Sequence, residues 1–581
     1  MSNDSTIQTS NSADLVTVTV LIDGTAVPEV YQLKNISVEK EINRIPFAQL
    51  IYFDGEAASQ DFQLSNEALF LPGHEIEIKA GYHNDEATIF KGVVIKHSIK
   101  IRESATVLVI ECRDKAIKTT LGRHSRYYYD SSDSDIIEQL LQEASLEADV
   151  TPTAVTHKEL VQYQSSYWDF MMTRSEVNGA ICVVDDGKVT IGPPDVQQEP
   201  IETVAFGTTM LDFDAEMDAR NQFSEVTAFG WNPSSQEIIE VASEDPRISL
   251  NGNVTAQDLA SALTPPPYHL KHGGMVTDSE LQEWSNAKAL FQQLSKTKGI
   301  VSFQGIPNVK PNTLLTLEGV GDRFNGTVFV TAVRHEIADG NWKVTAEFGM
   351  NPKWFSETYD IQSLPASGLL PAIHGLQIGI VTQLEEDPDG EDRILVQVPI
   401  INNEEQGIWA RVATLDAGEN RGSFFRPEIE DEVIIGFIND DPNDAIVLGM
   451  LHSSAKPAPL TASDDNHEKG FVTRSEMKMI FNDEKTSWTL STPSGKQIIV
   501  DEDADLISIA DDHQNKITLD ANGILLESAA DINVKATGDL NLEGTNITVK
   551  ANAQFKAEGS AGAEVSTSAI AVLKGSLVQI N

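Results

Sequence analysis

The chain is poor in cysteine and in positive charge, and each shortage excludes a class of protein. Its 581 residues include two cysteines, Cys112 and Cys182, both in apolar, strand-like runs. A secreted, disulfide-stapled domain is therefore excluded, and buried free thiols in a reducing compartment are expected. Lys and Arg total 42 against 88 Asp and Glu, which gives a formal net charge of −46. Such a surface repels phosphate, so we expect no nucleic-acid partner.

The sequence also lacks targeting signals and metal-binding patterns. Its first residues, MSNDSTIQTSNSADL, have neither the basic segment nor the apolar run of a signal peptide, and no stretch of eighteen apolar residues follows. We therefore expect synthesis in the cytoplasm, with exit from the cell by lysis or by mechanical ejection. The 12 histidines do not cluster, and CxxC and GxSxG motifs are absent. We predict no metal site, no cofactor and no enzymatic activity.

Two loops superficially suggest ligand sites. The glycines Gly319, Gly321 and Gly326 lack GxGxxG spacing and precede a strand, so the sequence favours a hairpin turn over a phosphate loop. The run Asp387–Asp392 lacks the alternating ligands and final glutamate of a calcium loop, so we interpret it as a solvated loop. Among 88 acidic residues, no pair stands out as the carboxylates of a glycosidase.

What the sequence does contain is a repeat at its C-terminal end. Apolar pairs two residues apart recur there, separated by turn clusters such as Asp520–Gly523. This alternation predicts short half-buried strands, and the fixed short period predicts a repeat architecture. The pairs are Ile507/Ile509, Ile517/Leu519, Ile524/Leu526, Ile532/Val534, Leu540/Leu542, Ile547/Val549, Phe555/Ala557, Ala563/Val565, Ile570/Val572 and Val578/Ile580.

Each predicted strand carries too narrow an apolar stripe to form a core within one chain. Three copies wound around a common axis would bury all three stripes and leave no free sheet edge. We therefore predict an intertwined trimeric β-helix needle, about 50 Å long if each repeat climbs about 4.8 Å. A single-chain solenoid is the alternative, although solenoids usually have longer coils with wider apolar faces. The predicted needle core is Ile517, Leu519, Ile524, Leu526, Ile532, Val534, Leu540, Leu542, Ile547, Val549, Phe555, Ile570 and Val572.

The remainder of the chain is predicted to be mainly β. Strand patterns at about 16–113 and 200–350 indicate two small β-barrel subdomains, and residues 373–452 indicate a further compact all-β unit. Amphipathic spacing and capping residues predict helices, the clearest of which begins with the capping box Thr277 and Glu280. The expected helices are 132–146, 168–177 and 278–295.

Residues 373–459 carry a specific set of motifs. The set includes Trp409-Ala410-Arg411-Val412, Phe425-x-Pro427-Glu428, Asp431-Glu432-Val433 and Gly436-Phe437. This segment resembles the OB-fold domain of VgrG proteins, the spikes of contractile injection systems in the phage tail hub–spike family. The stretches PGHEIEIKAGY, IFKGVVIKHSIKI, SYWDFMMTRSEVNG and VGDRFNGTVFVTAVRH are similar to the hub domain of that family. The resemblance covers residues from about 15 to 581.

The family's domain order implies where each part of this chain begins and ends. We expect a disordered N-terminus, a tail-hub-like domain with helical insertions, an OB-fold barrel, a neck and a triple-stranded β-helix needle. The corresponding ranges are 1–12, 13–365, 371–455, 456–485 and 486–581.

The resemblance implies a structural, non-catalytic homotrimer at the tip of a contractile injection system. Its hub would cap the inner tube and contact baseplate proteins, and its needle would puncture the target membrane, which it touches transiently, when the sheath contracts. A PAAR-like tip protein is expected on the needle end at Val578, Ile580 and Asn581, and effector cargo is a further candidate partner. The resemblance leaves open a type VI secretion apparatus or an extracellular phage-tail-like particle, and hence extracellular release or delivery to the target cell.

The sequence departs from those of some relatives in two ways, and both concern extra domains that the relatives carry. Only about thirty residues, 453–485, separate the OB-fold from the needle, too few for the lysozyme domain that some relatives insert there. The chain ends within the repeat, so we expect no toxin after the needle.

The alternative functions are a tail-associated cell-wall hydrolase and a trimeric adhesin or binding module using the OB-fold. No segment offers room for a catalytic domain. Nucleic-acid binding by an OB-fold needs basic and aromatic residues. The basic residues of 373–452 are Arg393, Arg411, Arg421 and Arg426 alone.

Overall fold

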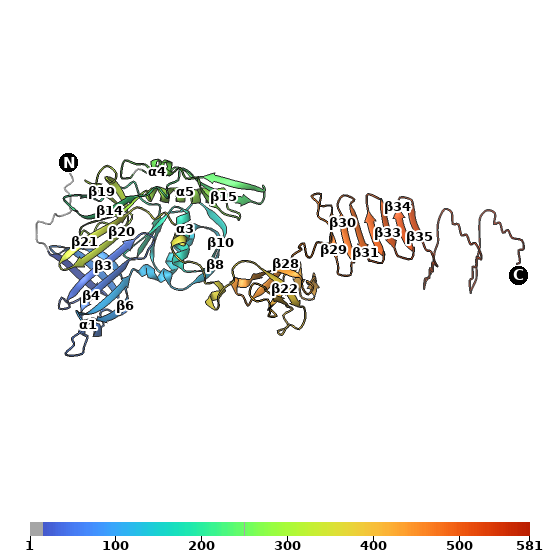
Figure 1. The fold of residues 1–581 in the computed structure, drawn as a ribbon, viewed down its shortest axis with the longest axis horizontal. Helices are drawn as coiled ribbons and strands as arrows, with labels where there is room; N and C mark the ends of the chain where they lie inside the picture. The colour runs from blue at the N-terminus through green and yellow to red at the C-terminus, as the bar shows by residue number, and fades with distance from the viewer. Residues whose placement is uncertain (1–14, 249, 581) are drawn as a thin grey trace. The chain divides into compact units, whose positions relative to one another are not determined.

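The computed structural model describes residues 15–248 and 250–580 and divides them into two compact units, one ending at Ala372 and the other beginning at Ile373 (Figure 1). Both units are built mainly of β-strands, so the predicted fold class is confirmed. Residues 1–12, which were predicted to be disordered, lie outside the described residues.

Most strands of the first unit belong to one thirteen-stranded sheet, whose main path runs β14-β18-β21-β20-β3-β4-β7-β6-β5-β1-β2. Every pair of neighbours along this path is antiparallel. The strands are β1 (Val16–Ile22), β2 (Thr25–Ala26), β3 (Leu33–Glu41), β4 (Phe47–Phe53), β5 (Glu75–Tyr82), β6 (Asp85–Ile101), β7 (Thr106–Arg113), β13 (Glu202–Ala205), β14 (Met210–Met217), β18 (Thr297–Gln304), β19 (Leu314–Glu318), β20 (Gly326–Ala338) and β21 (Asn341–Phe348). β13 pairs with β19, which pairs with β20.

The sheet joins two segments that the sequence placed in separate barrels. β20 pairs with β3 from Ala332↔Glu41 to Ala338↔Asn35, and this contact links residues 16–113 to residues 200–350. One apolar core draws on both segments, with Ile36 and Leu50 from the first and Val344 from the second. No local sequence pattern indicates that strands so far apart in the sequence pair with each other. Alternation alone therefore suggested two units.

Apolar and polar side chains alternate along strands such as β21, so one face of the strand is buried and the other is more exposed. In β21, Trp342, Val344 and Ala346 are buried in the core. The intervening residues Lys343 and Thr345 face the other side, as the period of two requires. Along β21 the sheet therefore has one apolar face that packs the core and one polar face.

The predicted helices are present, and two begin where their capping residues indicated. The Ser132 side chain caps α2 and the Thr277 side chain caps α5, each with a reciprocal acidic residue three positions later. α4 was missed, although Thr255 and Asp258 form the same capping box. The helices of this unit are α1 (Gln63–Asn66), η1 (Lys115–Thr120), α2 (Asp133–Glu143), α3 (Tyr167–Val177), α4 (Ala256–Leu263), α5 (Asp278–Leu294), α6 (Phe355–Thr358) and η2 (Pro365–Gly368).

Three small sheets accompany these helices. β8 (His124–Ser132) pairs with β10 (Thr156–Ser165). The other strands are β9 (Glu147–Val150), β11 (Ile181–Asp185), β12 (Lys188–Gly192), β15 (Val226–Asn232), β16 (Glu237–Ala242) and β17 (Tyr268–Lys271). Cys112 and Cys182 are buried and free, as predicted, and burial raises the pKa of both thiols.

The second unit begins with a closed five-stranded barrel, which confirms the predicted OB-type unit. Its strands are β22 (Gln377–Gln383), β23 (Ile394–Gln397), β24 (Ile408–Val412), β27 (Glu432–Phe437) and β28 (Ala445–Met450). Val381, Val396 and Val433 are fully buried in its core. Three short elements accompany the barrel strands: β25 (Ala417–Gly418), β26 (Arg421–Gly422) and η3 (Ile438–Asp440).

The second unit continues into a seven-stranded antiparallel meander, drawn in orange and red in Figure 1. Its strands are β29 (Glu468–Val472), β30 (Lys478–Asn482), β31 (Ser487–Ser491), β32 (Gln497–Asp501), β33 (Leu506–Ala510), β34 (Lys516–Asp520) and β35 (Gly523–Glu527). The first two lie within 456–485, the segment predicted as a neck. From 528 to 580 the described chain contains no strand.

Candidate functional site

One face of the meander carries two continuous rows of apolar side chains, which we call the apolar ladders. In each five-residue strand the second and fourth side chains point to the same face, and the register aligns these positions from strand to strand. The first ladder is Phe471, Met479, Leu490, Ile498, Ile509, Ile517 and Leu526. The second ladder is Phe481, Trp488, Val500, Ile507, Leu519 and Ile524.

The single chain leaves much of the ladders exposed to solvent. Ile524 is 73% exposed and Leu526 is 55% exposed. A hollow of about 650 Å³ lies on this face and is lined by residues that include Leu490, Ile509 and Ile517. Contiguous apolar surface of this kind marks an interaction site in a soluble protein.

Four of the predicted needle-core residues, Ile517, Leu519, Ile524 and Leu526, lie in the ladders. The other nine lie in the extended segment after Glu527, and each is more than half exposed. They are Ile532, Val534, Leu540, Leu542, Ile547, Val549, Phe555, Ile570 and Val572. A single chain is described, so the triple-stranded needle stays a prediction. Of the predicted tip residues, Val578 and Ile580 are exposed, and Asn581 lies outside the described residues.

The sequence analysis missed the part of the ladders that precedes Ile507. The stretches KMIFN, SWTLS and QIIVD repeat the same alternation, which is the signal that could have found it. The missed residues are Phe471, Met479, Phe481, Trp488, Leu490, Ile498 and Val500. Trp488 is notable because its buried Nε1–H group has no acceptor among the described residues.

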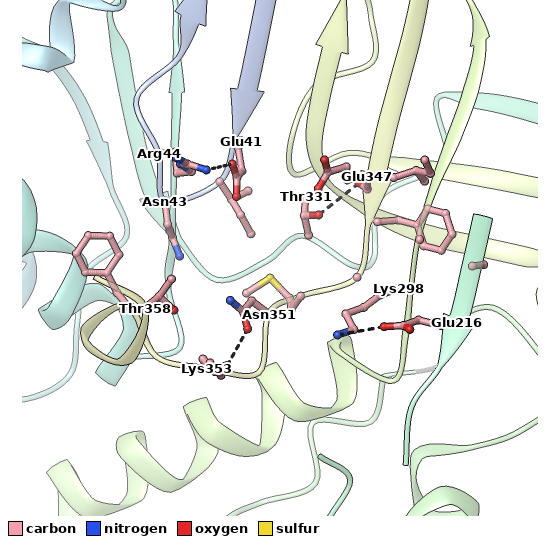
Figure 2. Close-up of a pocket in the computed structure, with 18 of the residues that line it drawn as sticks. Glu41, Asn43, Arg44, Glu216, Lys298, Thr331, Glu347, Asn351, Lys353 and Thr358 are labelled. Atoms are coloured by element: carbon pink, nitrogen blue, oxygen red, sulfur yellow. Dashed lines mark hydrogen bonds and ion pairs between the residues drawn. The ribbon is translucent and has the colours of Figure 1, made fainter. Parts of the chain in front are cut away.

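A second candidate site is a cavity of about 780 Å³ in the first unit (Figure 2). Its carboxylates are Glu41, Glu176, Asp214, Glu216 and Glu347. Arg44 Nη1 donates to Glu41 Oε2 at 3.0 Å, and Lys298 Nζ lies 3.6 Å from Glu216 Oε1. The described residues around it include no Ser, Cys or His, so the cavity contains neither a Ser–His nor a Cys–His pair.

Glu176 is the buried carboxyl of this cavity. Burial raises the pKa of Glu176 to about 7, against the opposing effects of the Phe355 N–H, which donates to Oε2 at 2.6 Å, and of Lys288. Burial likewise raises the pKa of Glu41, although Arg44 opposes it. Structural sites also shift pKa values, and the observed geometry supports a structural contact between α3 and α6.

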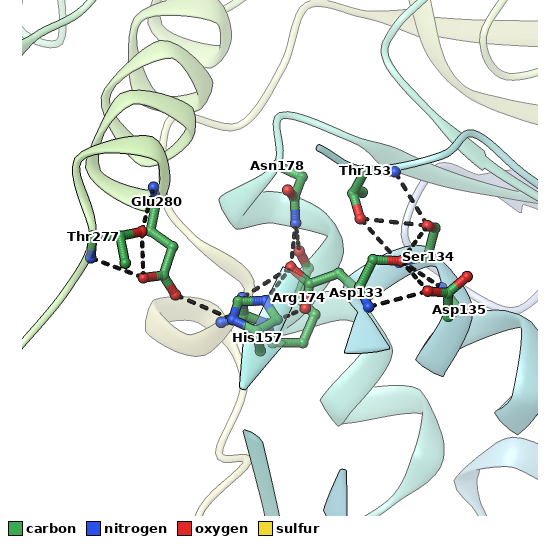
Figure 3. Close-up of polar contacts among 10 residues, drawn as sticks. Asp133, Ser134, Asp135, Thr153, His157, Arg174, Asn178, Thr277 and Glu280 are labelled. Atoms are coloured by element: carbon green, nitrogen blue, oxygen red, sulfur yellow. Dashed lines mark hydrogen bonds and ion pairs between the residues drawn. The ribbon is translucent and has the colours of Figure 1, made fainter. Parts of the chain in front are cut away.

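A third candidate is a buried ion-pair cluster that connects α2, α3, β10 and the start of α5 (Figure 3). Asp133 accepts hydrogen bonds from Arg174 Nε at 2.6 Å and Nη2 at 2.9 Å, and from Asn178 Nδ2 at 2.8 Å. His157 places Nε2 3.1 Å from Asp133 Oδ2 and Nδ1 3.2 Å from Glu280 Oε1.

This cluster is structural because its polar groups are already satisfied. Both ring nitrogens of His157 face carboxylates, so neither is left to activate a nucleophile. Burial alone would raise the pKa of Asp133, but the hydrogen bonds and charge of Arg174, with Asn178 and His157, hold it below its usual range.

Within residues 15–248 and 250–580, no three His, Cys, Asp or Glu side chains group in a way that could hold a metal ion. None of the helices in these ranges has the length and apolar character needed to cross a membrane.

Two protein families match the chain. Residues 12–339 match the family described as the Alg8 N-terminal domain, which covers more than half of the 581 residues. Residues 377–452 match the type VI secretion system/phage-baseplate injector OB domain, and this match coincides with the closed barrel.

Individual relatives match shorter stretches. The type VI secretion system spike protein VgrG3 of Vibrio cholerae serotype O1 is 32% identical over 117 residues, 18% of this chain and 11% of that protein. The spike protein VgrG1a of Pseudomonas aeruginosa is 32% identical over 74 residues, 13% of this chain and 12% of that protein. The matched stretches thus span about a tenth of these relatives' length. The solved tail protein of Neisseria meningitidis MC58 has 13% identity and a TM-score of 0.44, covering 58% of this chain and 98% of that one.

Proposed function

Because this chain belongs to the Alg8 N-terminal domain family and carries the injector OB domain of VgrG-like spike proteins, we propose that it is the structural hub and spike of a contractile injection system. The observation that carries the proposal is the pair of apolar ladders, which run across seven strands and remain exposed in one chain. Burial of apolar surface at about 25 cal/mol per Å² favours any assembly that covers them.

A homotrimer would cover the ladders of all three copies in one shared core. Each sheet face is two apolar residues wide, and three such faces around one axis enclose a narrow core without leaving an apolar face in water. The Trp488 indole N–H, which lacks an acceptor in the described chain, would meet a neighbouring copy in this arrangement. The extended residues 528–580 would gain strand partners from the other two chains.

The proposed partners and location follow from the same role. The hub would cap the inner tube and contact baseplate proteins, and the needle would carry a PAAR-like protein on its end and effector cargo. The needle would puncture the target membrane on sheath contraction. The protein would be part of a phage-tail-like particle, either released from the cell or delivered to the target cell.

The proposal excludes catalysis by this chain. The described lining of the first-unit cavity contains neither a Ser–His nor a Cys–His pair, and the histidine of the buried cluster is fully engaged. Peptidoglycan zymography with the purified protein should therefore give no clearing, whereas a cleared band would favour the hydrolase alternative.

Native mass spectrometry of the full-length protein at low micromolar concentration tests the trimer. One chain weighs 63.4 kDa, so a homotrimer gives 3 × 63.4 kDa, or about 190 kDa. A mass of one chain would contradict the proposal. A chain ending at Lys456 should lose most of the trimer if the ladders drive assembly, because it lacks the entire meander.

A further inference from the structure

Three strands of the meander, β30, β32 and β34, share a charge pattern. Each begins with a lysine, at its first position or directly before it, and ends with an aspartate, at its last position or directly after it. β31, β33 and β35 have no lysine within the strand or directly beside it. The lysines are Lys478, Lys496 and Lys516, and the aspartates are Asp483, Asp501 and Asp520.

This pattern gives the two borders of the sheet different charges. Because the meander is antiparallel, β30, β32 and β34 all run in the same direction, so their lysines lie on one border and their aspartates on the other (Figure 1). The aspartate border contains seven Asp and Glu against one Lys, 1 − 7 = −6, in its turns 483–486, 501–505 and 520–522. The lysine border contains four Lys and Arg against three Asp and Glu, 4 − 3 = +1, in its turns 473–478, 492–496 and 511–516.

Most of these charges have no partner within one chain. Among the described residues, Lys478, Lys516, Asp501 and Asp520 form no ion pair. A lysine cannot reach the aspartate of its own strand, because Lys496 and Asp501 are about 17 Å apart along β32 at about 3.4 Å per residue. The charges at the two borders are therefore available to another molecule, and their signs suit a second copy of the same sheet.

Threefold symmetry brings the two borders together. When three identical sheets surround an axis that runs along the stacking direction of their strands, the aspartate border of each sheet adjoins the lysine border of the next. Rotation about this axis does not change height, so each strand lies level with the same strand in the other copies. The lysine at the start of β32 in one copy then lies level with the aspartate at the end of β32 in the next, and the same holds for β30 and β34.

We propose that in the homotrimer the lysine at the start of β30, β32 and β34 in each copy forms an ion pair with the aspartate at the end of the same strand in the next copy. Three levels with three pairs each give 3 × 3 = 9 pairs. The pairs join Lys478 to Asp483, Lys496 to Asp501 and Lys516 to Asp520, always between two copies. The inference rests on the proposed function because it requires the homotrimer.

The main effect of these pairs is on how the copies align. Single exposed ion pairs add little stability, whereas complementary charges select one arrangement over others. Two copies that meet out of level by one strand place the lysines of β30, β32 and β34 opposite the first residues of β31, β33 and β35. Those residues are uncharged: Ser487, Leu506 and Gly523. The pairs therefore favour sheets that meet level with one another.

Coupling of the full-length trimer with a water-soluble carbodiimide tests the pairing directly. The reagent joins a lysine amine to a carboxylate in contact with it as an amide, and it takes up the water that is lost. We expect covalent dimers and trimers on a denaturing gel, and mass spectrometry of those bands should locate amides at the three pairs. Lys469 with Asp483 and Lys496 with Asp512 are ion pairs within one chain, so their coupling is the internal standard and leaves the mass of the band at one chain.

Charge reversal tests whether the pairs stabilise the trimer. Lys478→Asp/Lys496→Asp/Lys516→Asp and Asp483→Lys/Asp501→Lys/Asp520→Lys should each lower the dissociation temperature by several degrees, followed by light scattering, because like charges then meet between copies. The second variant makes the chain less negative, so overall repulsion cannot cause its loss. The six substitutions combined should restore the dissociation temperature. Glu138→Lys/Glu404→Lys/Glu405→Lys, an equal charge change at exposed positions outside the meander, should not lower it.

The outcomes separate this inference from the function on which it rests. A trimer of 3 × 63.4 kDa in which the standard couples but none of the three lysines couples to its aspartate in another copy would overturn the pairing and leave the trimeric spike intact. Charge-reversed trimers that dissociate at the unmodified temperature would equally overturn it. A full-length protein with the mass of one chain would remove both.

Discussion

At the scale of single residues, buried ionisable groups set how the stability of this protein depends on pH. Glu176 and Asp133 are both buried carboxyls in the first unit, yet their pKa values shift in opposite directions. Glu176 has the Phe355 N–H as a donor and the charge of Lys288, and burial prevails over both, whereas the bidentate Arg174 beside Asp133 outweighs burial. Their effects on stability therefore have opposite signs.

We expect Glu176→Gln to stabilise the protein at neutral and alkaline pH. The folded-state pKa of about 7 lies above the ordinary glutamate value of 4.5, so between these two pH values the native state holds a proton that the unfolded chain has lost. Stability therefore falls as pH rises from about 4.5 to about 7, by roughly 1–3 kcal/mol in all. The amide removes this loss and should raise the Tm of the first unit by several degrees at pH 8 and by nothing at pH 4.

Scanning calorimetry at both pH values checks this expectation. Glu138→Gln, which neutralises an exposed carboxyl on α2, serves as the control and should leave the Tm unchanged at each pH. An unaltered or lower Tm for Glu176→Gln at pH 8 would contradict the assignment of a buried, protonatable carboxyl.

We expect Arg174→Met to destabilise the first unit by about 3–5 kcal/mol at pH 7, because it leaves the buried Asp133 carboxylate without its charged partner. The depressed pKa of Asp133 means that the pair stabilises the fold above the unfolded pKa of about 3.9 and loses this effect as pH falls. Urea unfolding at pH 7 measures the destabilisation by Arg174→Met, and urea unfolding at pH 3 measures how much of it is lost at low pH. Arg220→Met removes an exposed arginine partner of Asp218 and should cost much less stability. Equal costs for the two variants would refute the buried-pair argument.

At the scale of secondary-structure elements, the sequence could predict the strands and helices that depend on neighbouring residues in the chain. Period-two alternation located the last strands of the meander and indicated an all-β unit at residues 373–452, and the capping residues Ser132 and Thr277 located two helices. Pairing between distant strands has no such local sign, so the β3–β20 contact was missed. The ladders before Ile507 were also missed, because their apolar pairs recur every nine or ten residues, a longer spacing than the seven or eight residues of the C-terminal end.

We expect Ile517→Asp to disorder the needle while the first unit stays folded. Ile517 lies between Ile509 and Leu526 in the first ladder, and the proposed trimer would bring three carboxylates together there at a cost of several kcal/mol. Limited proteolysis with mass spectrometry should show early cleavage within 500–581 and a persistent fragment from the first unit.

Asn522→Asp adds the same charge in the exposed turn between β34 and β35 and serves as the matched control. Its proteolysis pattern should match that of the unmodified protein. Resistance of 500–581 in Ile517→Asp equal to that in the control would refute the inward-facing assignment of the ladder.

At the scale of the whole molecule, net charge opposes the assembly that the ladders favour. A trimer would carry a formal charge of 3 × (−46) = −138. Self-repulsion of this size keeps the protein soluble and lowers the stability of the compact trimer. Residues 91–126 are a local exception, because they contain nine Lys and Arg against three Asp and Glu.

We expect added salt to stabilise the trimer at pH 8. The screening length falls from about 30 Å at 0.01 M to about 3 Å at 1 M ionic strength, so repulsion between copies weakens. The dissociation temperature, followed by light scattering, should rise by several degrees over this range. At pH 4.5, close to the sequence pI of about 4.5, the same titration should have little effect. A dissociation temperature that falls with salt at pH 8 would show that favourable ion pairs outweigh the net repulsion.

The order of strands in the meander determines how such a spike is made. Each strand from β29 to β35 bonds to its neighbour in sequence, so the loops that must close are short and the sheet can form in each chain within microseconds to milliseconds. Residues 528–580 contain no strand of their own in the described chain. In the proposed trimer their ordering would wait for encounters between chains, and its rate would rise with protein concentration. Folding would then proceed from the preformed meander toward the C-terminal end, which would be the last part to mature and the first to fray on dilution.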